Sequence, residues 1–502
     1  MKDRLRGTVV PVVVFVSLML PLWGGFTDDG YIHIQYANNI ITRGEYSFNP
    51  GEVSFGTTSP LWVMAHAAIG KLAGGGERLM ATSRVLSWLG GIVSVVLIYV
   101  LARAMGLGPW MAWLCTLAFG AHAWLVRWTA LAMESSSAVA ALTATGIASL
   151  GAFQDERRAW RLGFFMAVAS LLRPEAYLLL PVYLGTVLLQ RRRVRAACVV
   201  RTVAIYAALL VPWLLFARLH IGAFLPNTAG AKSGGLVLNP VVLLEKLIPI
   251  AKIVASAEAI PVLLIIAAVV VLKRKSRVLS VESRFLATWI VTLPLAYAVF
   301  DIQVLSRYML LTSPFVVVLG YVALDECSGA LAWVRQRRRA VAAAVTLAAV
   351  GLNVVLYFQV VVGPSRAFSS DLTHGLKELG TFLDRNAPAD AVVAAADIGY
   401  LAFYSHRRVL DLGGLVEDVT ARLRARYTYE EIVDRGLYLG IPAYPRVDYF
   451  IDRVKVAERF DGSVINGHRF EALRVTRVRN LGIKKPGPFY YTLYRLEPVE
   501  DG

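Results

Sequence analysis

Thr27-Asp28-Asp29-Gly30-Tyr31 follows directly on the apolar run 7–26. Two adjacent carboxylates beside hydrocarbon are costly, because each charge must be solvated or paired. The pair therefore indicates either a functional site or simply the point at which a membrane span reaches water. The positions of the other charges along the chain are needed to choose between these interpretations.

The composition predicts a polytopic membrane protein. The 502 residues are 57% hydrophobic and 17% charged, with a mean hydropathy of +0.56, a balance that excludes an ordinary soluble globular protein. The net charge of +17 comes from basic clusters between apolar runs, and no basic face with interleaved aromatic residues occurs, so we expect no nucleic-acid partner. Cys115, Cys198 and Cys327 lie in or beside apolar segments, which predicts neither a disulfide framework nor a zinc site.

The N-terminus carries Lys2, Arg4 and Arg6 ahead of the first apolar run, which is long enough to cross a bilayer. A signal peptide is the alternative interpretation, but no small-x-small cleavage site precedes Thr27. We therefore expect an uncleaved first span that enters the membrane from the cytoplasm.

Further apolar runs follow and, with the first, predict roughly eleven spans. The two runs beside Arg173-Pro174-Glu175 are short for a bilayer crossing and are expected to form a tilted pair or a re-entrant hairpin. The runs after the first cover about 85–101, 110–126, 136–153, 162–172, 176–189, 197–215, 247–272, 285–300, 309–324 and 340–362.

The basic clusters give the orientation of these spans. With a cytoplasmic N-terminus, the loops expected inside carry the clusters at 157–161, 191–195, 273–277 and 335–339, as the positive-inside bias requires. The same alternation places on the external face the polar residues Asp28, Asp29, Glu134, Glu175, Lys232 and Asp301.

Two domains are expected. Residues 1–362 form a mainly α transmembrane domain, whose first external loop, 27–82, holds helices near 31–42 and 60–72 along the membrane surface. Residues 363–502 are of ordinary polarity and predict a small extracytoplasmic α/β domain. Its expected elements are helices at 372–386 and 428–437 and strands at 391–396, 408–412 and 449–451.

Polar motifs from distant parts of the chain converge on the external side. Each has a plain structural alternative: Glu134 could complement a helix dipole, Asn227-Thr228 could cap a helix, and Asp301 with Arg307 could be an interfacial ion pair. Arg173-Pro174-Glu175 could be a turn between two helices, and His33 and His66 are more often loop residues than ligands. Together the motifs favour an active site at the outer leaflet, with carboxylates for proton abstraction and Arg or Lys for a phosphate.

The ordered series of motifs resembles the GT-C membrane glycosyltransferases, and more narrowly the branch with the mycobacterial arabinofuranosyltransferase B type. The first loop carries the motifs at 28–32, 35–39, 48–52 and 56–62. The resemblance continues through Met133-Glu134, Arg173-Pro174-Glu175, Leu225-Pro226-Asn227-Thr228, Ala231-Lys232, Ser306-Arg307-Tyr308, Asp397-Ile398-Gly399-Tyr400 and Leu410-Asp411-Leu412-Gly413-Gly414-Leu415. The sequence departs from the pattern at Gln35, Thr57 and Gly230, which bears on the identity of the sugar.

The resemblance implies an enzyme of the bacterial plasma membrane that transfers a sugar, for example arabinofuranose, from a polyprenyl-monophosphate donor. The acceptor would be a glycan, lipid or protein of the cell envelope, and direct displacement would invert the anomeric carbon. Asp28 or Asp29 would be the base, with Asp29 preferred. Arg173, Lys232 and Arg307 are the phosphate candidates. The other expected substrate-binding residues are Tyr31, Glu134, Glu175, Asn227 and Asp301. No cofactor is expected, although adjacent acids could bind a divalent cation.

Two alternatives belong to other functional classes. A transporter or flippase for lipid-linked sugars would also have many spans and outward charges, but its acids are expected near the membrane midplane. An inactive scaffold could bind glycan through its C-terminal domain, and the presence of Asp28-Asp29 argues against it.

Overall fold

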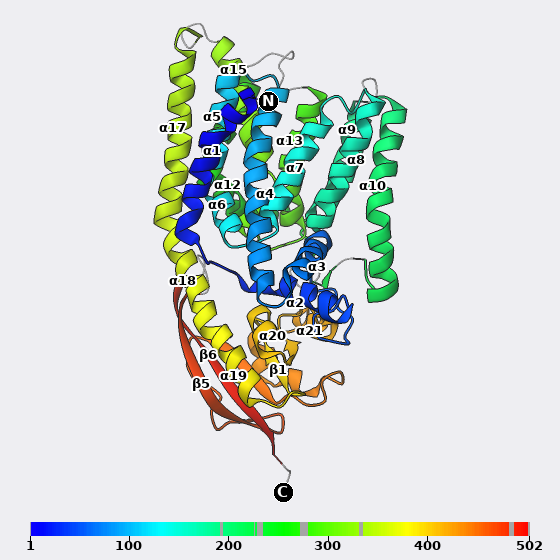
Figure 1. Ribbon diagram of the computed structural model, residues 1–502, viewed down its shortest axis with the longest axis vertical. Coiled ribbons are helices and arrows are strands. Elements are labelled where there is room, and N and C mark those ends of the chain that lie inside the picture. Colours follow the sequence, from blue (N-terminus) through cyan, green and yellow to red (C-terminus); the bar gives the residue numbers. More distant parts are fainter. Residues whose placement is uncertain are drawn as a thin grey trace. The chain divides into compact units, whose positions relative to one another are not determined.

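The chain folds into two compact units, which we describe separately (Figure 1). The computed structural model describes residues 2–190, 194–224, 226–227, 234–271, 280–330, 335–480 and 486–499. The first unit comprises Met1–Trp23, Arg84–Trp213 and Ser233–Val362. The second comprises Gly24–Ser83, Leu214–Lys232 and Gly363–Gly502. The first external loop of the sequence and the C-terminal region therefore belong to the same unit.

The first unit is built from helices. In the part of the chain that the structure describes, four helices are long and apolar enough to cross a membrane: Arg78–Ala104, Ala196–Ile221, Pro240–Val271 and Arg338–Asn386. Shorter apolar helices cover Gly7–Leu22 and Pro174–Leu189, so the expected number of roughly eleven spans stays a prediction. The elements are α1 (Lys2–Met19), η1 (Leu20–Leu22), α4 (Arg78–Ala104), α5 (Pro109–Gly120), α6 (Ala123–Ala130), α7 (Ser135–Ser149), α8 (Glu156–Leu172), η2 (Pro174–Leu178), α9 (Leu179–Leu189), α10 (Ala196–Phe216), α12 (Pro240–Val271), α13 (Val281–Val299), α14 (Ser306–Met309), α15 (Ser313–Ala330), α17 (Arg338–Leu356) and η6 (Tyr357–Val361).

Small residues let these helices approach closely, as is usual in membrane bundles. A Cβ atom on Gly320 of α15 would lie 2.8 Å from the Pro261 backbone of α12, so only glycine fits this crossing. A polar contact fixes a second junction, where the imidazole Nε2 of His122 lies 2.9 Å from the Glu258 carboxylate. The His122 Nδ1 accepts the Leu125 N–H, so Nε2 carries the proton and donates it to Glu258.

The second unit combines the two helices of the first loop with a mixed sheet. Its elements are α2 (Asp28–Arg43), α3 (Pro60–Ala73), η4 (Ala217–Ile221), α18 (Val362–Leu372), η7 (Thr373–Lys377), α19 (Glu378–Asn386), β1 (Val392–Ala395), α20 (Gly399–Ser405), β2 (Arg408–Asp411), α21 (Asp418–Arg424), α22 (Tyr429–Asp434), η8 (Leu437–Gly440), β3 (Tyr449–Val454), β4 (Val464–Ile465), β5 (His468–Asn480) and β6 (Pro486–Pro498). This mainly helical chain with a C-terminal sheet has the expected fold class.

The sheet has the order β2-β1-β3-β6-β5-β4. β1 pairs in parallel with β2 and β3, and the remaining pairs are antiparallel. The strands expected at 391–396, 408–412 and 449–451 are confirmed as β1, β2 and β3. The long antiparallel pair of β5 and β6 was not predicted from the sequence.

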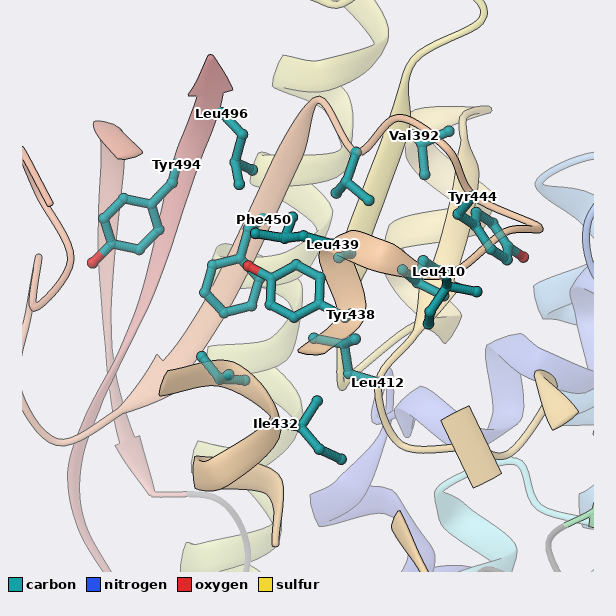
Figure 2. Packing of buried hydrophobic residues seen from close by; sticks show 14 of the residues in the cluster. Val392, Leu410, Leu412, Ile432, Tyr438, Leu439, Tyr444, Phe450, Tyr494 and Leu496 are labelled. Atoms are coloured by element: carbon teal, nitrogen blue, oxygen red, sulfur yellow. The ribbon is translucent and has the colours of Figure 1, made fainter. Parts of the chain in front are cut away.

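Aromatic and aliphatic side chains form the core beneath this sheet (Figure 2). Phe450 of β3 stacks on Tyr494 of β6 with 6.0 Å between ring centroids, and Tyr438 lies 5.4 Å from the Phe450 ring. Ile432 of α22 and Leu410 of β2 are both completely buried in the same cluster. Burial of each such side chain stabilises the folded state by about 1.5–3 kcal/mol. The core therefore holds β1 and β2 in place, and with them the start of the loops that leave their carboxyl ends.

Asn49 of the first loop completes the free edge of this sheet. Its side-chain amide donates to the Val409 carbonyl at 2.9 Å and accepts the Val409 N–H at 3.0 Å, as a neighbouring strand would. Glu52 of the same turn forms an ion pair with Arg408. The first loop and the C-terminal sheet therefore form a single folding unit, and Asn49-Pro50-Gly51-Glu52 has a structural role.

Candidate active site

The predicted site residues fall in both units, and each group is built up within its own unit. In the second unit, Thr27 is the N-cap of α2, and its hydroxyl accepts the Gly30 N–H at 3.2 Å. Asp28 and Asp29 occupy the first turn, where the helix dipole stabilises negative charge. Both side chains are half-buried.

The Asp28 carboxylate binds the amino end of α20. Its two oxygens accept the Gly399 N–H at 3.1 Å and the Tyr400 N–H at 2.9 Å. Burial, followed by the charge of Asp397, raises the pKa of the Asp28 carboxyl to about 7, although the two N–H donors act in the opposite direction. The carboxylate of Asp28 thus has a structural task, which sequence reasoning did not distinguish from the task of Asp29.

Tyr31 belongs to the same junction. It is 1% exposed, and its ring centroid lies 4.0 Å from that of Tyr400. Its hydroxyl lies 3.1 Å from the Tyr404 hydroxyl. These contacts show that the Tyr31 side chain packs between α2 and α20. We therefore do not include Tyr31 among the residues proposed to bind substrate.

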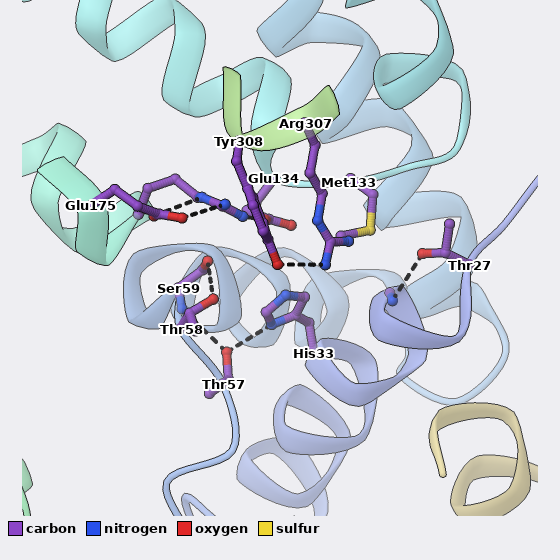
Figure 3. A network of polar contacts seen from close by, with 12 residues as sticks. Thr27, His33, Thr57, Thr58, Ser59, Met133, Glu134, Glu175, Arg307 and Tyr308 are labelled. Atoms are coloured by element: carbon purple, nitrogen blue, oxygen red, sulfur yellow. Dashed lines mark hydrogen bonds and ion pairs between the residues drawn. The ribbon is translucent and has the colours of Figure 1, made fainter. Parts of the chain in front are cut away.

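Two residues at which the sequence departs from the GT-C pattern are also buried in the second unit. The Thr57 hydroxyl lies 2.7 Å from the His33 Nδ1, and Figure 3 marks this contact with a dashed line. Gln35 donates to the Phe48 carbonyl at 3.3 Å. Both departures therefore alter the inside of the first loop and bear on its folding.

Asn227 also has a structural partner in this unit. Its side-chain amide donates to Asp418 of α21 at 2.6 Å, and its N–H donates to the Phe55 carbonyl at 3.0 Å. Lys232 and Thr228, which were predicted beside it, lie outside the described residues.

In the first unit, Glu134, Arg173 and Glu175 form one cluster (Figure 3). Arg173 follows α8 in an extended conformation, as its position before Pro174 requires. Its guanidinium group pairs bidentately with Glu175, at 3.1 and 2.8 Å, and also with Glu134. Tyr297 donates to Glu175 at 3.0 Å. Two carboxylates thus neutralise a single buried cation, so Arg173 is better suited to holding the acids than to binding phosphate.

Arg307, unlike Arg173, lies close to a second arginine. Its guanidinium carbon is 5.2 Å from the ring centroid of Trp128, and the guanidinium carbon of Arg127 is 4.5 Å from the same centroid. The indole N–H of Trp128 donates to Ser306 at 2.9 Å, which ties α6 to α14. The two arginines are only 7% and 5% exposed.

Arg127 was missed by the sequence analysis. Its buried Nε atom has no hydrogen-bond partner among the described residues. A lone arginine directly after an apolar run and before a tryptophan was the available signal, because a charge at such a depth is costly unless it binds something.

Asp301 forms an ion pair with a lysine of α12. Its carboxylate lies 2.5 Å from the Lys246 Nζ, so the ion pair considered as a structural alternative for Asp301 is made with this lysine. No group of three or more His, Cys, Asp or Glu side chains in the described ranges has the arrangement of a metal site. Binding of a divalent cation stays a prediction.

Comparison with known proteins identifies the fold. A family described as a domain of unknown function (DUF8728) matches residues 367–494, and no curated protein matches the chain by sequence. The chain is similar to ArnT from Cupriavidus metallidurans bound to undecaprenyl phosphate, with a TM-score of 0.59, 14% identity and 97% coverage of both chains. It is also similar to the Archaeoglobus fulgidus oligosaccharyltransferase, with a TM-score of 0.60, 13% identity, and coverage of 89% of this chain and 67% of that one.

A third similar structure is the archaeal oligosaccharyltransferase AglB from Archaeoglobus fulgidus, in complex with an inhibitory peptide and a dolichol-phosphate. Its TM-score is 0.58 at 12% identity. These likenesses show that the chain has the fold of the GT-C membrane glycosyltransferases. With its apolar helices, the chain is an integral membrane protein. The narrower likeness to the arabinofuranosyltransferases is not confirmed.

Proposed function

We propose that the protein is a glycosyltransferase that moves a sugar from a polyprenyl-monophosphate donor to a cell-envelope acceptor outside the plasma membrane. The single observation that carries this proposal is the buried pair of Arg127 and Arg307 beside Trp128. Two like charges buried beside each other repel, and an anion that binds both would offset that repulsion. A lipid phosphate has the charge and the acceptor oxygens that two guanidinium groups recognise.

The reaction is a single displacement at the anomeric carbon. A hydroxyl oxygen of the acceptor forms the new bond to this carbon while the bond to the phosphate oxygen breaks, and the lipid phosphate leaves with the electron pair. Asp29 is the base that removes the hydroxyl proton. Arg127 and Arg307 stabilise the negative charge that grows on the leaving phosphate. The anomeric configuration is therefore inverted.

The cluster of Glu134, Arg173 and Glu175 has a different task in this scheme. It carries one net negative charge, because two carboxylates share one guanidinium group. Carboxylate oxygens are good acceptors for sugar hydroxyls, so we assign the two glutamates to sugar binding and Arg173 to their orientation. The sugar proposed for this site is a pentofuranose such as arabinofuranose, as the resemblance implies.

Purified protein in detergent, supplied with radiolabelled polyprenyl-phosphate sugars and an envelope glycan acceptor, tests the proposal. We expect transfer of label to the acceptor with inversion, read by the anomeric coupling of the product. The transporter alternative is tested in proteoliposomes with the same donors. Label that crosses the membrane and is never transferred would contradict glycosyl transfer and favour a flippase.

A further inference from the structure

The contact between Asp28 and α20 joins residues that are 371 and 372 positions apart in the chain. One carboxylate oxygen is used by each of two successive N–H groups, those of Gly399 and Tyr400. These N–H groups begin a helix and have no partner within it. The carboxylate of Asp28 therefore does for α20 what an N-cap side chain does, although it comes from a distant helix.

The backbones of Asp28 and Gly399 also approach each other closely at this contact. A Cβ atom on Gly399 would lie 2.1 Å from the Asp28 carbonyl oxygen, so no larger residue fits without displacement of α2 or α20. Tyr31, one helical turn after Asp28, stacks on Tyr400 at 4.0 Å. The first turn of α2 is thus held against α20 by hydrogen bonds, by ring stacking and by the absence of a side chain at Gly399.

The charged groups around Asp28 are themselves fixed. Asp397 precedes α20, and both its oxygens accept from Arg453 of β3, at 2.5 and 2.6 Å. The Tyr491 hydroxyl of β6 donates to Asp397 at 2.6 Å. The charges of Asp397 and of Asp29 on α2 both act on Asp28, and the Asp28 charge acts in turn on Tyr491. Arg453 and Tyr491 hold the Asp397 charge in place, so the surroundings of Asp28 come from the C-terminal sheet.

We propose that Asp28 is a positioning residue, which fastens the first turn of α2 to α20 and so fixes the direction of Asp29. The N–H groups of Gly399 and Tyr400 each take one acceptor site on an oxygen of Asp28 and hold the carboxylate against α20, which makes it a poorer base for an acceptor hydroxyl than Asp29. The kinetic part of this proposal rests on the proposed glycosyl transfer. Its structural part does not.

The kinetic part of the test compares three variants of the full-length protein. Asp28→Asn keeps one side-chain acceptor for α20 but cannot act as a base. Gly399→Ala disturbs the same contact from the α20 side and alters no carboxylate. Asp29→Asn removes the proposed base and leaves the contact in place.

Turnover with a polyprenyl-phosphate sugar separates the two roles. A positioning role predicts that Asp28→Asn keeps the rate within about tenfold and that Gly399→Ala lowers kcat at least as much. Asp29→Asn should lower kcat by roughly 10²–10⁴, the usual contribution of a general base. Loss of the same size in Asp28→Asn, together with an unaffected Gly399→Ala variant, would overturn the proposal.

Hydrogen exchange gives a readout that needs no activity. We expect the amides of Gly399 and Tyr400 to exchange slowly in the unaltered protein and in Asp29→Asn. They should exchange at least about tenfold faster in Asp28→Ala, because the acceptor is gone. Equal protection in Asp28→Ala would overturn the positioning role. A protein that shows this protection pattern but no turnover contradicts the proposed function alone.

Discussion

Arg127 and Arg307 lie against the same indole ring, with guanidinium carbons 4.5 and 5.2 Å from the Trp128 centroid. The two come from helices α6 and α14, which are far apart in the sequence. Cation–π contact offsets only part of the cost of burying a charge, roughly 2 kcal/mol when the pair is desolvated. The role proposed for the pair is to bind the phosphate of the donor, and this role can be measured in two ways.

Removal of either charge should weaken use of the donor. We expect Arg127→Gln and Arg307→Gln each to lower kcat/KM by about 10–100-fold, since a hydrogen bond to a charged group contributes about 1.5–3 kcal/mol. The Arg127→Lys variant should regain little of the lost kcat/KM, because lysine lacks the planar guanidinium group that contacts two phosphate oxygens at once. Arg158→Gln is the control, because Arg158 is exposed and paired with Asp155. Equal rates in Arg127→Gln and the control would contradict the assignment.

The same pair makes a prediction for the ligand-free protein. Arg127→Met replaces a buried charge that lacks a partner at Nε, so thermal unfolding should occur at the same or a higher temperature than in the unaltered protein. Undecaprenyl phosphate should then stabilise the unaltered protein by mass action and the variant much less. A variant that is less stable without lipid, yet equally stabilised by it, would show that Arg127 is structural.

Arg173 should behave in the opposite way. Its removal leaves Glu134 and Glu175 together in a buried site, so Arg173→Ala should destabilise the protein by about 3–5 kcal/mol. The triple variant with Arg173→Met, Glu134→Gln and Glu175→Gln should recover most of this loss, because no unpaired charge remains. Denaturant unfolding in detergent measures both differences. A triple variant no more stable than Arg173→Ala would refute the ion-cluster account.

The pH dependence of stability reports on Asp28. Its folded-state pKa is raised to about 7 from an ordinary value near 3.9. A raised acid pKa stabilises the folded state below the ordinary value, and this contribution is lost as the pH rises towards and through 7. The melting temperature of the unaltered protein, minus that of Asp28→Asn, should therefore decrease between pH 4 and pH 8. If this difference in melting temperature instead increases between pH 4 and pH 8, the two N–H donors lower the pKa of Asp28 by more than burial raises it.

Local patterns in the sequence were enough for much of the fold. The apolar runs indicate the membrane class, and the helix predicted near 31–42 is present as α2 (Asp28–Arg43), which begins three residues earlier because Thr27 caps it. The strands β1 to β3 are short segments, each with at least two adjacent hydrophobic residues, such as Val409-Leu410 in β2 and Phe450-Ile451 in β3. The pair of β5 and β6 carries many arginines and tyrosines instead, and it was missed because half its residues face water.

The separate roles of the site residues could be assigned only from the three-dimensional structure. Asp28 and Asp29 are adjacent and chemically identical, and only the pairing of Asp28 with Gly399 and Tyr400 separates them. Arg173 and Arg307 were equivalent phosphate candidates until the ion pairs of Arg173 with Glu134 and Glu175 were seen. Asp28 is 371 and 372 residues from Gly399 and Tyr400, and Glu134 is 39 residues from Arg173, so no local pattern records these contacts.

The most direct test of the account is the rate of sugar transfer from a polyprenyl-phosphate donor by Asp29→Asn. The control is Asp390→Asn, an exposed acid of the second unit that pairs only with Arg446 in the part of the chain described. We predict that Asp29→Asn transfers sugar roughly 10²–10⁴ times more slowly than the unaltered protein, and that it still binds undecaprenyl phosphate normally. Transfer by Asp29→Asn at the rate of the control would contradict the account.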